Sequence, residues 1–401
     1  MKSKLIIIMI DGISSDYFIE YPQFMPHTHA LAKNNTVITN LAPEQCGSSL
    51  PGRASMLTGQ PSRHHGIYGN KIWDCEEKSF RYASPYDVRT PTLFTHAKKS
   101  GLDTANIGFG MTRPEDCTIY KPPHWIGDFV SRSRDNQPIP ISEDWRKALT
   151  IIDDGRIEIA QSRFSASNNN TRVINDPPIF NELILDQQMV QLVNEIINSS
   201  QPPDLIFTEI NVTDSVQHQF GYASATSNFS IAFADMLVGL VVHTLKQAGL
   251  DSDYSIIVTS DHGHADTDKA LYVNNILDNQ NWNAECAVLF LEQTVDIGDS
   301  INALDIHGAT ILDEKFLPKD IQGQVLPLAM REKVSFEVGP SGSAAQSGVS
   351  KYKSSHSYYP GTQSDKRFAV ISGPGCKNHH LQQATAEQFY EIMGDIIGLA
   401  F

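Results

Sequence analysis

The sequence is poor in cysteine and short of positive charge, and both deficits exclude classes of protein. Its 401 residues include five cysteines, and none belongs to a Cys-x-x-Cys pair. An odd and scattered set predicts reduced thiols in a cytoplasmic protein rather than a disulfide framework. Lys and Arg number 31 against 46 Asp and Glu, a formal net charge of −15. This balance argues against a protein that coats nucleic acid through a basic surface.

Long hydrophobic runs are also missing. The longest are Leu5–Ile10 and Met236–Val242, whereas a helix that spans a membrane needs roughly 18 or more apolar residues. The opening residues, MKSKLIIIMIDG, do not offer the small-residue cleavage site of a signal peptide after their apolar run. We therefore expect a cytoplasmic protein without a membrane span, long enough to bury a substantial core. The sequence leaves the oligomeric state open.

What the sequence does contain is a series of short apolar runs that alternate with helical patterns. The runs are continuous rather than alternating, as in parallel strands that are covered on both faces. They are Leu5–Ile10, Asp204–Ile210, Tyr254–Ser260 and Phe368–Ser372. The helical patterns are Phe180–Asn198, Ser230–Gln247 and Thr385–Leu399. This order predicts an α/β fold, with a mostly parallel central sheet between helices.

Two regions break the alternation. Residues 115–178 are rich in Pro, Asn, Ser, Asp and Arg, and residues 265–350 mix short strand-like runs with a Gly/Ser-rich stretch. We predict a catalytic core made of residues 1–114, 179–264 and 351–401. The range 115–178 is then a cap insertion, and 265–350 is a second insertion or small subdomain.

The residues able to carry chemistry follow the predicted strands. Asp11 comes directly after the first strand, and Asp261 and His262 come directly after a later one. Asp214 and His218 follow the strand that ends at Ile210, and their spacing of four places them on one helical face. Taken singly, Asp11 is as readily a turn residue before Gly12, and the Asp214–His218 pair is more readily a solvated pair at a helix start. Because open parallel sheets bind ligands beyond the carboxyl ends of their strands, we expect these side chains to converge.

Ser49 and His356 complete the set. Ser49 lies in the segment SLPGRASMLTG near a predicted helix start, where free N–H groups favour developing negative charge. Taken alone, a serine at a helix start is most often only a helix N-cap, and His356 alone is a loop histidine. Together, three Asp, three His and one Ser suit two zinc-like ions, which can clamp both oxygens of an in-line displacement at phosphorus.

These motifs resemble the alkaline phosphatase superfamily, and most closely its type I phosphodiesterase/nucleotide pyrophosphatase branch, which includes phosphonoacetate hydrolase-like enzymes. The resemblance covers nearly the whole chain in the family's order. It is carried by I-D-G (10–12), S-L-P-x-R-A-S-M-L-T-G (49–59), H-G-I-Y-G-N (65–70), D-S-V-Q-H (214–218), S-D-H-G (260–263) and H-S-Y (356–358).

The resemblance implies an alkaline-phosphatase-like α/β/α sandwich and a phosphoester hydrolase that acts on a small phosphorylated substrate. It implies two divalent ions, Zn²⁺ first and Mn²⁺ as the alternative. One ion would be held by Asp11, Ser49, Asp261 and His262, and the other by Asp214, His218 and His356. Ser49 would attack phosphorus and form a covalent phosphoserine. Asn70 would donate to a non-bridging phosphoryl oxygen.

The sequence departs from the branch at three places. Ser49 stands where threonine is usual, Gly52-Arg53 where Asn-His is usual, and Ser357 where glycine is usual. The resulting Ser-x-Pro-x-Arg also resembles the sulfatase core, in which the serine or cysteine becomes formylglycine. A sulfatase and a phosphonate C–P hydrolase are therefore the alternatives. We favour phosphoryl transfer because the additional imidazoles suit zinc rather than calcium.

Further residues lie near these motifs. Arg53 could bind a substrate anion or pair with a core carboxylate. Tyr68 and Trp73 could stack on a leaving group, against the alternative of ordinary packing. His264 and Asp266 follow the S-D-H-G motif and could orient metal ligands.

Overall fold

The computed structural model describes most of the chain. The described residues are 3–44, 47–126, 133–134, 137–138, 143–165, 178–277, 280–294, 297–331, 333–362, 365–374, 376 and 380–399. Much of the predicted cap insertion, at 127–132, 135–136, 139–142 and 166–177, lies outside them.

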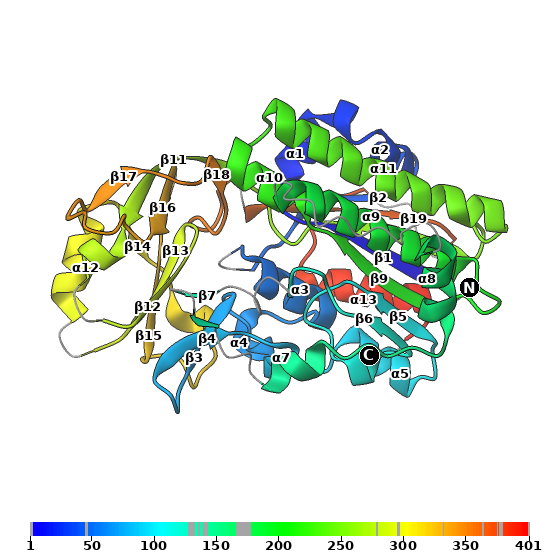
Figure 1. The fold of residues 1–401 in the computed structure, drawn as a ribbon, viewed down its shortest axis with the longest axis horizontal. Helices are drawn as coiled ribbons and strands as arrows, with labels where there is room; N and C mark the ends of the chain where they lie inside the picture. Colours follow the sequence, from blue (N-terminus) through cyan, green and yellow to red (C-terminus); the bar gives the residue numbers. More distant parts are fainter. Residues whose placement is uncertain are drawn as a thin grey trace.

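An eight-stranded sheet forms the centre of the larger lobe (Figure 1). Its strands, in spatial order, are β20 (His380–Leu381), β2 (Thr36–Leu41), β19 (Arg367–Ser372), β10 (Tyr254–Thr259), β1 (Lys4–Ile10), β9 (Leu205–Ile210), β5 (Thr104–Ile107) and β6 (Ile119–Lys121). Among these described strands β19 alone runs antiparallel to its neighbours. The predicted mostly parallel sheet is confirmed.

Helices cover both faces of this sheet, and β1 shows why. Its side chains alternate, so that Leu5, Ile7 and Met9 enter one hydrophobic cluster and Ile6, Ile8 and Ile10 enter another. The first cluster contains side chains of α3 (Ser49–Thr58), α5 (Leu93–Lys99) and α13 (Ala386–Ile397). The second contains side chains of α1 (Ser15–Glu20), α8 (Arg156–Ser165), α9 (Pro178–Ile197), α10 (Val212–Phe220) and α11 (Ala225–Ala248), with α2 (Pro26–Ala32) packed nearby. The two clusters make the predicted α/β/α sandwich.

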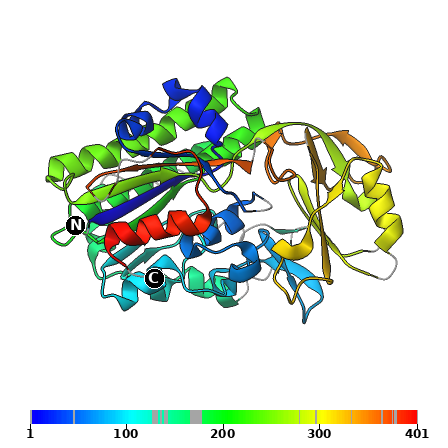
Figure 2. The same ribbon diagram turned by 180° about the vertical axis from the view of Figure 1, so that it is seen from behind.

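A smaller lobe lies beside the sandwich (Figures 1 and 2). One of its sheets contains β11 (Ala265–Tyr272), β16 (Lys333–Glu337), β17 (Ser347–Val349) and β18 (Ser354–Ser355). The other contains β12 (Trp282–Glu285), β13 (Val288–Glu292), β15 (Val325–Ala329) and β14 (Thr310–Ile311), and α12 (Ile297–Asp305) lies alongside. A separate hydrophobic cluster fills this lobe.

The remaining elements are short. They are α4 (Ser62–His65), α7 (Glu143–Ala148), the hairpin of β3 (Lys71–Asp74) and β4 (Ser79–Tyr82), and the pair β7 (Ser133–Arg134) and β8 (Gln137–Pro138). Two elements fall inside the range predicted as a cap insertion, 115–178, and belong to the core instead. Strand β6 is an edge strand of the main sheet, and α8 packs on α9. Their hydrophobic residues are too few to give a strand or helix signal in that polar stretch.

Helix α11 is long and apolar enough to span a membrane by length and composition alone. Core helices of globular proteins meet the same criterion, and α11 packs on α9, α10 and α2. Its burial is one-sided, because Phe229, Met236 and Leu240 are exposed. The sequence suggested a helix apolar nearly all round, and the structure shows that only part of that surface is covered.

Candidate active site

Three neighbouring parallel strands bring the predicted site residues together. Strands β10, β1 and β9 lie side by side in the sheet and run in one direction. Asp11 follows β1, Asp261 follows β10, and α10 with Asp214 follows β9. Since the carboxyl ends of parallel strands share one edge, residues some 200 positions apart in sequence meet there.

Asp11, Asp261 and His262 form the first cluster, with ligand atoms within 4.8 Å of one another. Nδ1 of His262 lies 3.1 Å from the carbonyl oxygen of Gly263, to which it donates, so Nε2 carries the lone pair. That nitrogen lies 3.3 Å from Oδ1 of Asp11. Oδ1 of Asp11 is buried and has no hydrogen-bond partner in the described part of the chain. Two acceptors that face each other at this distance fit a cation between them.

Asp214, His218 and His356 meet beside the first cluster. One turn of α10 places Oδ1 of Asp214 3.5 Å from Nε2 of His218. His356 follows β18, in the returning chain of the smaller lobe, and its Nε2 lies 3.9 Å from the same carboxylate oxygen. The structure therefore brings together all the predicted metal ligands, from both lobes.

His264 holds Asp214 in place, as the sequence suggested. Its Nε2 lies 2.7 Å from Oδ1 of Asp214, and its Nδ1 lies 2.9 Å from Oγ of Ser354. Burial lowers the pKa of His264 to about 3, so the ring is neutral. Asp266, the other residue expected to orient ligands, instead accepts a hydrogen bond from the N–H of Tyr222 at 3.2 Å.

The electrostatics of the site show how much negative charge it concentrates. Burial, with the nearby carboxylate of Asp261, raises the pKa of Asp11 well above its usual range. Burial and the neighbouring His356 ring lower the pKa of His262 well below its usual range. Burial alone raises the pKa of Asp214, but the neighbouring His218 and His264 outweigh burial and hold this pKa well below its usual range. The neutral rings of His262 and His264 among buried carboxylates fit the donor set expected of a metal site.

Ser49 lies at the first position of α3 with its hydroxyl directed at this cluster. Its Oγ is 3.1 Å from Nε2 of His262. The N-cap of the helix is Ser48, so the alternative in which Ser49 serves merely as the cap does not describe this structure. Gly52 allows α3 to come this close, because a Cβ there would lie 2.6 Å from the carbonyl oxygen of Asp261.

Arg53 is buried beneath the site and pairs with protein carboxylates. Its Nη2 lies 2.7 Å from Asp11, its Nη1 2.7 Å from Asp261 and its Nε 2.8 Å from Glu209. Nη2 also donates to Oδ1 of Asn211 at 3.0 Å. Of the two roles predicted for Arg53, the structure shows the pairing with core carboxylates. It fixes the outer oxygens of two predicted metal ligands.

Asn70 lies opposite the start of α3 and is held there by the smaller lobe. Its Oδ1 accepts a hydrogen bond from the N–H of Leu50 at 2.9 Å, which leaves the amide Nδ2 as the donor end. Glu285, on β12, accepts hydrogen bonds from the backbone N–H groups of Asn70 (2.7 Å) and Lys71 (2.6 Å). The smaller lobe thus positions the predicted oxyanion donor.

A cleft of about 330 Å³ joins these groups, a volume typical of small-molecule sites. The described residues that line it include Asp11, Ser49, Arg53, Asn70, Trp125, Glu182, Asp214, His218, Glu285, Cys286, Tyr352 and His356. Tyr68 and Trp73 are not among them. Both rings are buried, at 1% and 4% exposure, in the hydrophobic core, where Tyr68 packs on Phe290 and Trp73 on Phe80. Their predicted contact with substrate is therefore replaced by packing.

Sequence reasoning missed several residues of the site. Glu209 ends up under Arg53, Glu285 under the Asn70 loop, and Cys286 beside His218 and His356. Glu209 is the fifth residue of a buried strand. A charged residue inside such an apolar run needs a buried partner, so this position could have indicated a residue near the site. Glu285 and Cys286 belong to a segment whose pairing the sequence did not define, so nothing in the sequence pointed to them.

Comparison with known proteins identifies the family. The type I phosphodiesterase / nucleotide pyrophosphatase family matches residues 5–325, and the chain belongs to it. Alkaline phosphatase PhoK of Sphingomonas sp is 24% identical over 397 residues, covering 84% of this chain and 64% of that protein. A bis(5'-adenosyl)-triphosphatase of Xenopus laevis is 21% identical over 421 residues, covering 99% of this chain and 78% of that protein. These matches confirm the resemblance to the alkaline phosphatase superfamily.

Solved structures share the fold. Murine ectonucleotide pyrophosphatase / phosphodiesterase 5, an inactive form in complex with AMP, superposes with a TM-score of 0.70 at 16% identity, covering 100% of this chain and 96% of that one.

An uncharacterized pyrophosphatase/phosphodiesterase of Schizosaccharomyces pombe is 23% identical over 280 residues, or 69% of this chain and 48% of that protein. The chain thus spans about half to two thirds of the length of these curated relatives from yeast and Sphingomonas.

Proposed function

We propose that the chain hydrolyses phosphate esters, with phosphodiesters or nucleotide pyrophosphates as the first substrate class and Ser49 as the nucleophile. The observation that carries this proposal is the position of Ser49 Oγ at a helix start, 3.1 Å from the neutral imidazole nitrogen of His262 and beside the other predicted ligands. Family membership supports the reaction class. It favours phosphoryl transfer over the sulfatase alternative, which rests on Ser-x-Pro-x-Arg alone.

We propose that two zinc ions occupy the site. Asp11, Ser49, Asp261 and His262 would hold one, and Asp214, His218 and His356 the other. The unpartnered Oδ1 of Asp11 and the facing lone pair of His262 fit such an ion. When bound, the ions supply Lewis-acid stabilisation of phosphoryl charge and lower the pKa of the groups they contact.

The residues of the chain then have distinct roles. Ser49 Oγ gives up its proton to solvent and bonds to phosphorus while the ester P–O bond breaks and the leaving group departs as the alcohol, protonated by solvent. Water later cleaves the phosphorylated serine, which releases the phosphoryl product and restores the hydroxyl. The N-terminal end of α3 faces the developing negative charge. Arg53 keeps the carboxylates of Asp11 and Asp261 in position from below.

Asn70 is expected to stabilise the transition state. Replacing Asn70 with alanine removes a preorganised donor, and loss of one such donor lowers kcat by about 10²–10³-fold. Initial-rate kinetics on a phosphodiester measure this, and KM should change less than kcat. Asn281→Ala serves as a matched control, because Asn281 is an exposed asparagine that bonds to Glu292 and is not among the residues that line the cleft. Equal losses in the two variants would remove the role assigned to Asn70.

Metal removal tests the cofactor. After dialysis against a chelator, turnover should fall in step with metal content measured by mass spectrometry, and Zn²⁺ should restore it, with Mn²⁺ as the comparison ion. Two equivalents of metal per chain are expected at full activity, because the ligands form two clusters. Full activity in metal-free protein would refute the two-ion proposal.

A substrate panel tests the reaction class. Bis-p-nitrophenyl phosphate and nucleotide p-nitrophenyl esters should be hydrolysed, p-nitrophenyl phosphate compares the monoester, phosphonoacetate tests the C–P alternative and p-nitrophenyl sulfate tests the sulfatase alternative. The mass of intact active protein should retain the serine at position 49, since formylglycine would lower it by about 2 Da. Turnover of the sulfate ester alone would overturn the proposed function.

A further inference from the structure

Cys286 is directed into the active-site cleft by a turn of the smaller lobe. It follows β12 and precedes β13, and it has a φ of +55°, a conformation that few residues other than glycine adopt. Backbone hydrogen bonds fix this turn: Phe336 N–H donates to the Cys286 carbonyl at 2.7 Å, and Ala287 N–H donates to the His356 carbonyl at 3.1 Å. The second bond ties the turn to the segment that carries a predicted metal ligand.

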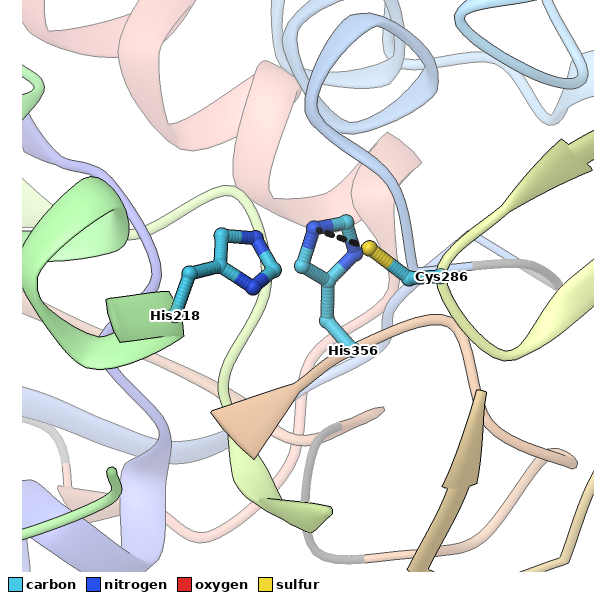
Figure 3. Close-up of side chains that lie close together, drawn as sticks. All are labelled: His218, Cys286 and His356. Carbon is cyan, nitrogen blue, oxygen red and sulfur yellow. Dashed lines mark hydrogen bonds between the residues drawn. The ribbon is translucent and has the colours of Figure 1, made fainter. Parts of the chain in front are cut away.

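The thiol lies within a cluster of three potential ligands. Cys286, His218 and His356 each offer one atom, and these atoms lie within 4.8 Å of one another. Sγ of Cys286 is 3.5 Å from Nε2 of His356. Figure 3 shows the sulfur and the two imidazole rings directed toward a common space, from three separate elements. The half-buried thiol also lines the cleft.

Both imidazoles present the same nitrogen to that space. Nδ1 of His218 lies 2.9 Å from the Ser354 carbonyl, and Nδ1 of His356 lies 3.1 Å from the Gly47 carbonyl. A carbonyl accepts only, so each Nδ1 carries the proton and each Nε2 carries a lone pair. This is the outer hydrogen-bonding pattern that orients metal-binding histidines.

We infer that Cys286 is a thiolate ligand of the ion held by Asp214, His218 and His356, an inference that rests on the two-ion site proposed above. With Zn–N of about 2.0–2.1 Å and Zn–S of about 2.3 Å, tetrahedral N and S ligands lie about 3.6 Å apart and two N or O ligands about 3.4 Å apart. The Cys286–His356 and Asp214–His218 distances are both 3.5 Å. The Asp214–His356 distance is longer, at 3.9 Å, and the sulfur lies within 4.8 Å of the His218 ligand atom, so the side chains must draw closer to surround one zinc ion.

A thiolate ligand would affect which metal the site prefers and how that metal coordinates the substrate. Sulfur favours Zn²⁺ over Mn²⁺ or Mg²⁺, which prefer oxygen. Four protein ligands also fill a tetrahedral zinc ion, whereas catalytic zinc keeps one position open. With four protein ligands the ion would have no open position, so Cys286 would both favour zinc and compete with a phosphoryl oxygen for the metal.

Cobalt substitution tests the inference in the full-length chain. Co²⁺ is added to metal-free protein and the absorption spectrum is recorded. A thiolate ligand gives a charge-transfer band in the near ultraviolet, in addition to the visible bands of bound cobalt. We expect this band in the wild type and in Cys75→Ser, which alters an exposed cysteine. We expect it to be absent from Cys286→Ala, and from His218→Ala because the ion is lost there.

The outcomes separate this inference from the proposed function. Visible cobalt bands without the charge-transfer band, or a band that persists in Cys286→Ala, overturn the thiolate ligand and leave the two-ion site standing. That result would mean that Cys286 only donates a weak hydrogen bond to His356. Absence of cobalt binding to the wild type overturns both proposals.

Chelator competition supplies a second readout that does not depend on activity. Cys286→Ala should weaken Zn²⁺ binding at this site by about 10–100-fold, as changes around metal sites commonly do. Mn²⁺ binding should change by less than about threefold, because sulfur contributes little to it. An equal effect on both ions would contradict a thiolate ligand.

Discussion

Replacing Ser49 with alanine is expected to reduce kcat by about 10⁴-fold or more while the fold stays intact, because removal of a nucleophile leaves only binding and electrostatic contributions. The hydroxyl lies at the first position of α3, 3.1 Å from Nε2 of His262. Alanine also has the higher helix propensity, so helix α3 should form as before. Initial rates on a phosphodiester measure the loss, and circular dichroism checks the fold.

Ser49→Thr is the matched control. Threonine keeps a hydroxyl at the same atom, and it is the usual residue at this place in the family that the chain resembles. We expect at least partial activity from it. A rapid acid quench during turnover should trap a phosphoryl group on the peptide that contains Ser49 in the wild type. Wild-type turnover in the alanine variant would show that another group attacks phosphorus.

Replacing Arg53 with alanine is expected to cause the largest loss of stability, about 3–5 kcal/mol, because it leaves buried charges without their partner. The side chain is 1% exposed and pairs with Asp11, Asp261 and Glu209. Bound metal offsets part of this loss at the two aspartates, but not at Glu209. Urea unfolding followed by tryptophan fluorescence measures the change, and activity should fall as the ligands lose their orientation.

Two further variants define the cause of that loss. Arg53→Lys keeps the charge but cannot direct three N–H groups at three carboxylates, so only partial recovery is expected. Arg89→Ala removes an exposed pair with Asp320, whose side chains are 45% and 53% exposed, and should cost less than about 1 kcal/mol. A loss for Arg53→Ala no larger than that for Arg89→Ala would contradict the role assigned to Arg53.

Part of the site could be predicted from the sequence, because the patterns that indicate it are local. An uninterrupted apolar run such as Leu5–Ile10 predicts a strand covered on both faces, and the polar residue after it predicts a ligand at the sheet edge. The spacing of Asp214 and His218 predicts a shared helical face, and the structure shows their side chains 3.5 Å apart. These inferences need only a few consecutive residues and the geometry of a helix or strand.

Other assignments failed or stayed open because they depend on contacts between distant segments. Arg53 could bind substrate or carboxylates until the fold placed Glu209 beside it. Tyr68 and Trp73 were candidates for stacking until the core enclosed them. Strand β6 and helix α8 were hidden in a polar stretch, since short elements at the edge of a sandwich bury few side chains.

The sequence by itself determined the alternation of strands and helices, the order of the motifs and the set of predicted ligands, because each follows from the periodicity or chemistry of neighbouring residues. The tertiary structure alone decided which groups surround those ligands. Glu285 and Cys286 reach the site because the smaller lobe folds back over the sheet edge, and backbone hydrogen bonds to Asn70 and His356 fix them there. Such proximity is set by long-range packing, which no local pattern encodes.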